Sequence, residues 1–498
     1  MNMLTAINGS RHLFLDLDDV ESMHNVVQTV CEATKHPDNP VLPLGAEDEW
    51  DSCQASPWAS RTVIYDDEER IFKAWYEGGR GADVPREQDP FWITTGYAIS
   101  EDGIHWQKPR LGHIEYHGSR DNNICSLGTG CVAKDVREPD AAKRYKMIVK
   151  GPWAPLEGYP HGGPKLRICY SPDGIHWTEG PYLSDSLPDL ILNDVVALLC
   201  DDQDPDPQRR IKIAWQIKHP PRKPGPPEVR AKSMGFGPDI EHLVASADNP
   251  VISPDDGLED EIHFLMLGAY EGMYVMPYEY GWYAPNDTGV YGSYFGDIRL
   301  AVSRDGEHFR RVQPHQKTIA RGARGEWDDG FIVIADKPVI KDDTIYLYYS
   351  GNGEQWLEWP PENMSDPSRL YVLPTSRMGV ATLRRDGYTC LETTDRETPG
   401  HVTTGPIEIC GGDLRLVLNV GDVDPGRSWV EVEVLDAERG EVLDGFDRKE
   451  CSDVCEDAIR VPVAWKAKSL ADVGASRIRL RFFLYGAARL YSYGFENL

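Results

Sequence analysis

The chain is poor in basic residues and has no long apolar run. Its 498 residues hold 52 Lys and Arg against 81 Asp and Glu, which gives a formal net charge of −29. Such a chain repels phosphate backbones and anionic headgroups, so we expect neither nucleic acid nor a membrane as partner. No stretch approaches the length of a membrane span, and the N-terminus shows no leader-like apolar core. We therefore expect a cytoplasmic protein.

Cysteine is also scarce, with ten residues, most of them inside apolar runs typical of buried thiols. Cys451 and Cys455 have a C-x3-C spacing, but no second pair or histidine cluster accompanies them, which argues against zinc. The sequence has no glycine-rich phosphate loop and no nucleophile elbow. We expect no metal in the working site and no organic cofactor, although clustered acidic side chains can hold a structural calcium ion.

Helical periodicity is nearly absent, which excludes helical solenoids and alternating β–α folds. What is present is an internal repeat of the phrase Ser-x-Asp-Gly-x-His-aromatic. It occurs at 100–106, 171–177 and 303–309, with degenerate copies at 237–243 and 384–390. Asp-Gly between two alternating runs predicts a hairpin, because the turn needs a positive φ that glycine adopts readily.

Each hairpin joins the third and fourth of four predicted antiparallel strands, a to d. Five such units predict an all-β fold, a five-bladed β-propeller followed by a C-terminal β-sandwich. We place the propeller domain at 1–398 and the sandwich at 399–498, with segment 26–42 supplying an outer strand that closes the ring. We expect the sandwich to brace the propeller, because it shows no cluster of exposed aromatic residues; carbohydrate binding is the alternative.

The connections between strands b and c are long and rich in Gly, Pro and aromatic residues in every unit, and all five share one face. Loops of this length are unusual unless they are functional. Trp153, Trp282 and Trp356 in or beside them are suited to stacking on sugar rings. This face is therefore the predicted binding face.

Acidic residues stand at the starts of the inner strands on the same face. We predict catalytic roles for Asp51, Asp194, Asp329 and Glu261, because an ionised and a protonated carboxyl together cleave glycosidic bonds. The predicted substrate-binding residues are the three tryptophans above with Trp50, His263, Trp327, Asp336, Tyr270 and Glu271. Acids of the a-to-b turns, such as Asp66 and Asp201, are turn formers and are excluded from catalysis.

The hairpin repeat and the trailing sandwich resemble glycoside hydrolase families 32, 43 and 68. That resemblance implies hydrolysis, or transglycosylation, of furanosides such as fructan or arabinan-type oligosaccharides. The catalytic motifs differ: Glu49-Trp-Asp-Ser stands where family 32 has Asn-Asp-Pro-Asn-Gly, and Asp194 is the nearest acid to the start of blade three. The expected partner is an oligosaccharide, and a homo-oligomer is possible. A non-catalytic sugar-binding propeller and a protein-interaction propeller remain as alternatives.

Overall fold

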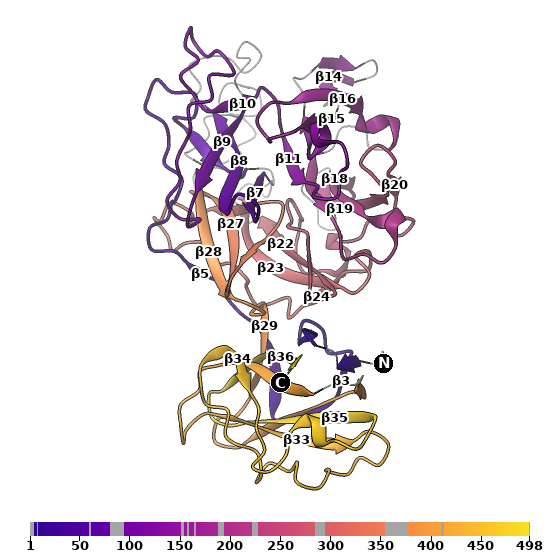
Figure 1. The fold of residues 1–498 in the computed structure, drawn as a ribbon. Coiled ribbons are helices and arrows are strands. Elements are labelled where there is room, and N and C mark those ends of the chain that lie inside the picture. The colour runs from indigo at the N-terminus through magenta and orange to yellow at the C-terminus, as the bar shows by residue number, and fades with distance from the viewer. Residues whose placement is uncertain are drawn as a thin grey trace. The chain divides into compact units, whose positions relative to one another are not determined.

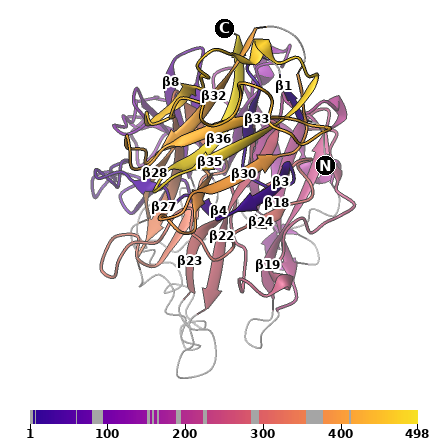
Figure 2. The ribbon, with the colours of Figure 1, turned by 90° about the horizontal axis from the view of Figure 1, so that it is seen from below.

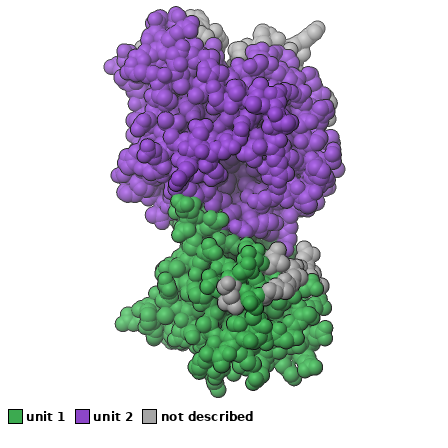
Figure 3. Space-filling model, viewed as in Figure 1, with its two compact units in different colours: residues 1–32, 342–345, 383–498 green, residues 33–341, 346–382 purple. Residues whose placement is uncertain are grey.

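The computed structural model describes residues 4–6, 8–58, 61–79, 94–150, 154–156, 159–163, 166–187, 194–221, 228–283, 294–353, 376–409 and 413–497. Within these ranges the regular structure is β-strand apart from short 3-10 turns, and no helix is long and apolar enough to cross a membrane. The chain divides into two compact units (Figure 3). Unit 1 comprises 1–32, 342–345 and 383–498; unit 2 comprises 33–341 and 346–382.

Unit 2 is a five-bladed β-propeller, which confirms the fold predicted from the repeat (Figure 1). Strands within a blade pair antiparallel with their chain neighbours. Blades 1 to 3 comprise β6 (Gln54–Ser56), β7 (Thr62–Asp66), β8 (Ile71–Gly79), β9 (Thr94–Ser100) and β10 (Ile124–Ser126); β11 (Thr129–Lys134), β12 (Tyr145–Lys150), β15 (Leu166–Ser171) and β16 (Thr178–Tyr182); and β17 (Val195–Cys200), β18 (Ile211–His219), β19 (Val229–Gly237) and β20 (Val244–Ala245). Blades 4 and 5 comprise β21 (Gly268–Tyr270), β22 (Met273–Tyr283), β23 (Tyr294–Ser303) and β24 (Arg310–Val312); and β25 (Phe331–Ile334), β26 (Val339–Lys341), β27 (Thr344–Asn352), β28 (Ser376–Arg384) and β5 (Thr34–Lys35).

Only part of the predicted segment 26–42 pairs with the propeller, because residues 26–30 form a strand of unit 1. β5 pairs antiparallel with β28 as the outer strand of blade 5. The Asn39 side chain then extends this edge, because its amide donates to the Val380 carbonyl and accepts from the Val380 backbone N–H. Asn249 makes the same pair of bonds to Met234 in blade 3. The repeated Asp-Asn-Pro-Val phrase thus fixes an outer edge in two blades.

The a-to-b turns carry a repeated buried ion pair. The Nζ atom of Lys73 lies 2.8 Å from Asp66, and that of Lys212 lies 2.8 Å from Asp201, with all four side chains at most 2% exposed. Tyrosine hydroxyls from the next blade add bonds to both carboxylates. Asp66 and Asp201 therefore join neighbouring blades, in keeping with their exclusion from catalysis.

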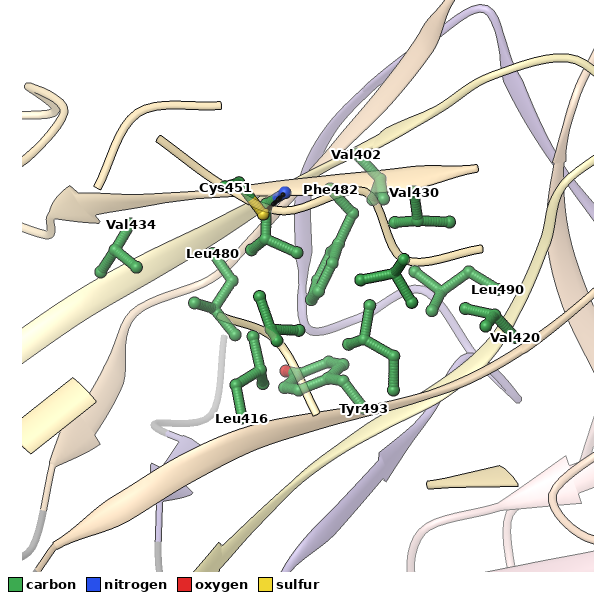
Figure 4. Close-up of a cluster of buried hydrophobic side chains, with 14 of the residues drawn as sticks. Val402, Leu416, Val420, Val430, Val434, Cys451, Leu480, Phe482, Leu490 and Tyr493 are labelled. Carbon is green, nitrogen blue, oxygen red and sulfur yellow. Dashed lines mark hydrogen bonds between the residues drawn. The ribbon is translucent and has the colours of Figure 1, made fainter. Parts of the chain in front are cut away.

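Unit 1 is a β-sandwich of two sheets (Figure 2). One sheet runs β1 (Leu4–Ala6), β31 (Ile407–Ile409), β35 (Arg477–Leu484), β30 (Gly400–Thr404) and β3 (Val20–His24), with β33 (Val430–Asp436) also on β35. The other runs β34 (Ala458–Pro462), β32 (Leu414–Gly421), β36 (Arg489–Asn497), β29 (Thr389–Thr393) and β4 (Val26–Val30), with β2 (Arg11–Leu13) on β36. Alternate residues of β35 are buried, and side chains such as Leu416, Leu480, Phe482 and Tyr493 meet in the core (Figure 4).

The sandwich is larger than the predicted 399–498. Residues 1–32 and 383–398 belong to unit 1, because β4 pairs with β29 and β2 pairs with β36. The expectation that the sandwich lacks an aromatic cluster is also corrected. Trp429 stacks on Tyr485 at 4.3 Å, and Phe483 lies 5.6 Å from His401, all partly exposed. The sequence alone did not reveal these contacts, because Trp429 and His401 are far in the chain from Tyr485 and Phe483.

Candidate active site

A group of charged and phenolic side chains lies at the ends of strands b and c in blades 3 and 4, on the side of the b-to-c connections. We call it the carboxylate cluster. Its members are Arg230, Lys232, Glu261, Glu279, Tyr283 and Tyr294. The first two come from β19, the others from blade 4. Glu261 reaches Glu279 because its backbone forms a bridge with Gly281 of β22.

Glu261 is held in a fixed direction by two neighbours. Arg230 donates to its Oε1 and the Tyr283 hydroxyl donates to its Oε2, so both oxygens are occupied. The side chain is only 1% exposed. Paired with a guanidinium in this way, Glu261 acts electrostatically on the neighbouring Glu279.

Glu279 is that neighbour. Its side chain is fully buried. Burial, followed by the charge of Glu261, raises the pKa of Glu279 to about 8, against the opposing effects of the Lys232 charge, a hydrogen bond from Tyr294 and the Arg230 charge. The carboxyl is thus protonated at neutral pH, which is the state of a general acid.

Two glycines make room for this arrangement. A side-chain carbon at Gly296 would lie 2.9 Å from Glu279 Oε1, and one at Gly281 would lie 2.0 Å from the Tyr294 hydroxyl oxygen. Neither position can take a larger residue without displacing the cluster.

Lys232 and His263 are the titratable neighbours of Glu279, and Asp194 acts on Lys232. Burial lowers the pKa of Lys232 to about 7, while the acids Glu261, Glu279 and Asp194 oppose that fall. His263 Nδ1 lies 4.0 Å from Glu279 Oε2, and burial, then Arg230, keeps the pKa of His263 well below its ordinary value. Asp194 is half-buried directly before β17, and its electrostatic effect on Lys232 ties it to this part of the propeller.

Aromatic side chains from three blades adjoin the cluster. Trp58, partly exposed, lies 6.0 Å from Phe264 and 5.7 Å from Phe331 between ring centroids. His263 stacks on Phe264 at 4.2 Å, and Tyr294 lies 5.5 Å from Phe331. A partly exposed tryptophan beside acids of this kind is suited to stacking on a sugar ring.

The Glu-Trp-Asp motif forms a duplicated structural module that holds Asp51 and Asp328. Tyr76 donates to Asp51 and Tyr349 donates to Asp328, while lysine Nζ atoms lie 2.6 Å from each carboxylate. Trp50 stacks on Tyr76 at 5.6 Å, and Trp327 stacks on Tyr349 at 5.7 Å. Trp50 is buried and Trp327 partly exposed. Two copies with the same contacts favour a structural role for Asp51, the predicted catalytic acid of blade 1.

Asp329 follows this module in blade 5. Its Oδ2 accepts from the Gly325 backbone N–H at 2.6 Å, and the side chain is 8% exposed. It lies near Gly353, where strand b of blade 5 gives way to its b-to-c connection. Asp329 thus lies on the predicted face.

Asp336 lies between the two halves of the inner strand of blade 5, at the propeller axis. Its backbone N–H donates to Arg61 and its carbonyl accepts from Leu267, while Lys337 Nζ donates to carbonyls of β11 and β17. The segment therefore touches the inner strands of the other four blades. Asp336 is fully buried, and burial raises its pKa to about 6.

The other predicted contacts are dispersed. Tyr270 and Glu271 form the tight turn between β21 and β22, six or more residues from Glu279 along β22. Trp282 points to the other face of β22 from Glu279, since successive side chains of a strand alternate. There it lies 6.0 Å from Phe295 and under the Arg321 guanidinium. Trp153 and Trp356 lie outside the described residues.

Glu279 was not predicted from the sequence, although the alignment of the b strands contains a signal for it. Strand pairing aligns Phe72, Tyr145, Ile211 and Tyr274, and five residues beyond each lie Glu77, Lys150, Gln216 and Glu279. This position is polar in each of the four strands. In blade 1 it is satisfied, because Glu77 accepts from Arg61, Gln54 and Thr129. Glu279 would have been recognised as a candidate site residue only by aligning the b strands position by position.

No group of three or more His, Cys, Asp or Glu side chains within the described residues is arranged to hold a metal ion.

No family model and no curated protein matches the chain. Several solved structures are similar to it. A glycosyl hydrolase of Bacteroides ovatus is 15% identical over 71% of this chain and 93% of its own, with a TM-score of 0.45. A structure described with the GH130 family of mannoside phosphorylases, which contains glycoside hydrolases that target β-1,2 mannosidic linkages in Candida mannan, is 14% identical over 71% and 93%, with a TM-score of 0.45.

A family 43 arabinoxylan arabinofuranohydrolase of Bacillus subtilis, in complex with cellotetraose, covers more of the chain. It is 13% identical over 94% of this chain and 99% of its own, with a TM-score of 0.37. These neighbours are glycoside hydrolases, the class that the sequence resembles.

Proposed function

We propose that the protein is a glycoside hydrolase, or a transglycosylase, that acts on oligosaccharides of the furanoside type. The observation that carries the proposal is Glu279, whose pKa is raised to about 8 by burial and by the charge of Glu261. A carboxyl kept neutral at pH 7 by burial and a negative neighbour is what protonation of a glycosidic oxygen requires.

Asp194 is the proposed base or nucleophile, with Asp329 as the second candidate. Asp194 is half-buried, whereas Glu261 is occupied by Arg230 and Tyr283. Trp58 and His263 would contact the sugar ring. Lys232 would limit the rise of the Glu279 pKa through its positive charge. No step of this reaction needs a metal or an organic cofactor.

The test is hydrolysis of nitrophenyl glycosides and of fructo- and arabino-oligosaccharides by the wild type and by Asp194→Asn and Asp329→Asn. Loss of the assigned base or nucleophile should lower kcat about 100-fold or more, with substrate binding retained. If the wild type binds oligosaccharides but does not hydrolyse them, the non-catalytic alternative is supported and the proposed enzymatic activity is contradicted.

A further inference from the structure

Two cysteines lie side by side where the chain enters and leaves the propeller unit. Cys31 follows β4, and Cys390 lies in β29. In the antiparallel pairing Cys390 faces Thr29, and the Cys31 backbone N–H donates to the Tyr388 carbonyl at 3.0 Å. Cys31 and Cys390 are therefore diagonal neighbours on the same face of the sheet.

The two thiols touch. Their side chains are hydrogen-bonded to each other, and both are reduced in the structure. Cys390 is buried, while Cys31 is partly exposed and open to a small reagent. Both belong to unit 1.

We propose that Cys31 and Cys390 are a redox-active pair that closes to a disulfide when exposed to a small oxidised thiol such as oxidised glutathione. All of unit 2 lies between them in the chain. The bond therefore ties the two ends of the propeller together covalently, in addition to the β5–β28 pairing that closes it by hydrogen bonds.

The electrostatics give the two sulfurs different roles. The hydrogen bond from Cys390, followed by nearby Arg489, lowers the pKa of Cys31 against the effect of burial. The same hydrogen bond, then burial, raises the pKa of Cys390. Cys31 is therefore the attacking thiolate and Cys390 the resolving thiol.

The chemistry balances with oxidised glutathione as the oxidant. The Cys31 thiolate attacks one glutathione sulfur, forms a mixed disulfide and releases the first glutathione. Cys390 loses its proton to solvent, attacks the Cys31 sulfur and releases the second. The two cysteines give up two electrons and two protons, and the glutathione disulfide becomes two reduced molecules.

The experiment incubates the full chain with oxidised glutathione and then maps its peptides without reduction. The expected product is one linked pair of peptides containing Cys31 and Cys390, with the intact chain lighter by two hydrogen atoms. The propeller transition should melt several degrees higher, because the bond restricts the unfolded chain. A chain cut once between the two cysteines should also migrate as one species until it is reduced.

Cys31→Ser and Cys390→Ser should each abolish the linked peptides and the melting shift. Cys53→Ser, which alters another partly exposed cysteine, should leave both unchanged. A glutathione adduct that persists on Cys31, or a linkage between other cysteines, would overturn the proposal. Peptide mapping does not depend on hydrolysis, so its result tests the disulfide independently of the proposed function.

Discussion

At the scale of the residue, the chemistry depends on how two neighbouring glutamates differ. Glu261 has a guanidinium and a phenol on its oxygens, whereas burial and the charge of Glu261 raise the pKa of Glu279 to about 8. The same residue type therefore has a different environment at the two positions. Environment, and not residue type, assigns the roles.

The pH dependence of hydrolysis should reflect the raised pKa of Glu279. Activity should fall as pH rises through about 8, because the acid then loses its proton. Glu261→Gln removes the negative neighbour and should move this alkaline limb to lower pH by about one unit. A pH profile of kcat for both proteins checks this; an unmoved limb would contradict the assignment.

Glu279 should also lower the free energy of unfolding as the pH rises. Its pKa in the folded state is about 8, against an ordinary 4.5, so between these values the folded chain holds a proton that the unfolded chain has lost. Stability therefore falls with rising pH across this window.

The Glu279→Gln side chain is neutral at every pH, so the free energy of unfolding of this variant should depend less on pH. Relative to the wild type, it should rise by about 2 kcal/mol between about pH 5 and pH 7. Urea unfolding at several pH values tests this. Equal pH slopes for the two proteins would mean that Glu279 is ionised throughout.

At the scale of the element, the two ends of the strands differ. The a-to-b ends of blades 1 and 3 hold buried lysine–aspartate pairs, and the b-to-c end of blades 3 and 4 holds the carboxylate cluster. The repeat predicted the aspartates of these turns as turn formers, because they recur in the sequence, but not their lysine partners. Glu279 was not predictable in this way, because only the pairing register aligns it with Glu77.

Breaking a pair at the a-to-b end should affect stability alone. Lys212→Met leaves Asp201 buried with the Tyr274 hydroxyl and should cost about 3–5 kcal/mol. Lys212→Met with Asp201→Leu should recover much of that loss. Denaturation measures both, while KM should stay at the wild-type value; a changed KM would place this end of the strand in the binding site.

At the scale of the whole molecule, the sequence was informative about architecture and less so about boundaries. Five hairpin repeats predicted the blades. The extent of the sandwich was not predictable, because β1 to β4 join strands more than 350 residues away in the chain. Of the predicted site, Glu261 and His263 lie at the cluster and Asp194 acts on it, while Asp51 belongs to a duplicated structural module.

The most direct test of the central claim compares leaving groups in Glu279→Gln. A general acid matters for an oligosaccharide, whose leaving oxygen needs a proton, and much less for a dinitrophenyl glycoside, whose leaving group departs as a stable anion. We predict a loss of kcat of about 100-fold or more on the oligosaccharide and a small loss on the dinitrophenyl substrate. Glu101→Gln, an exposed change in a c-to-d hairpin, should alter neither rate. Equal losses on both substrates, or none, would contradict Glu279 as the acid.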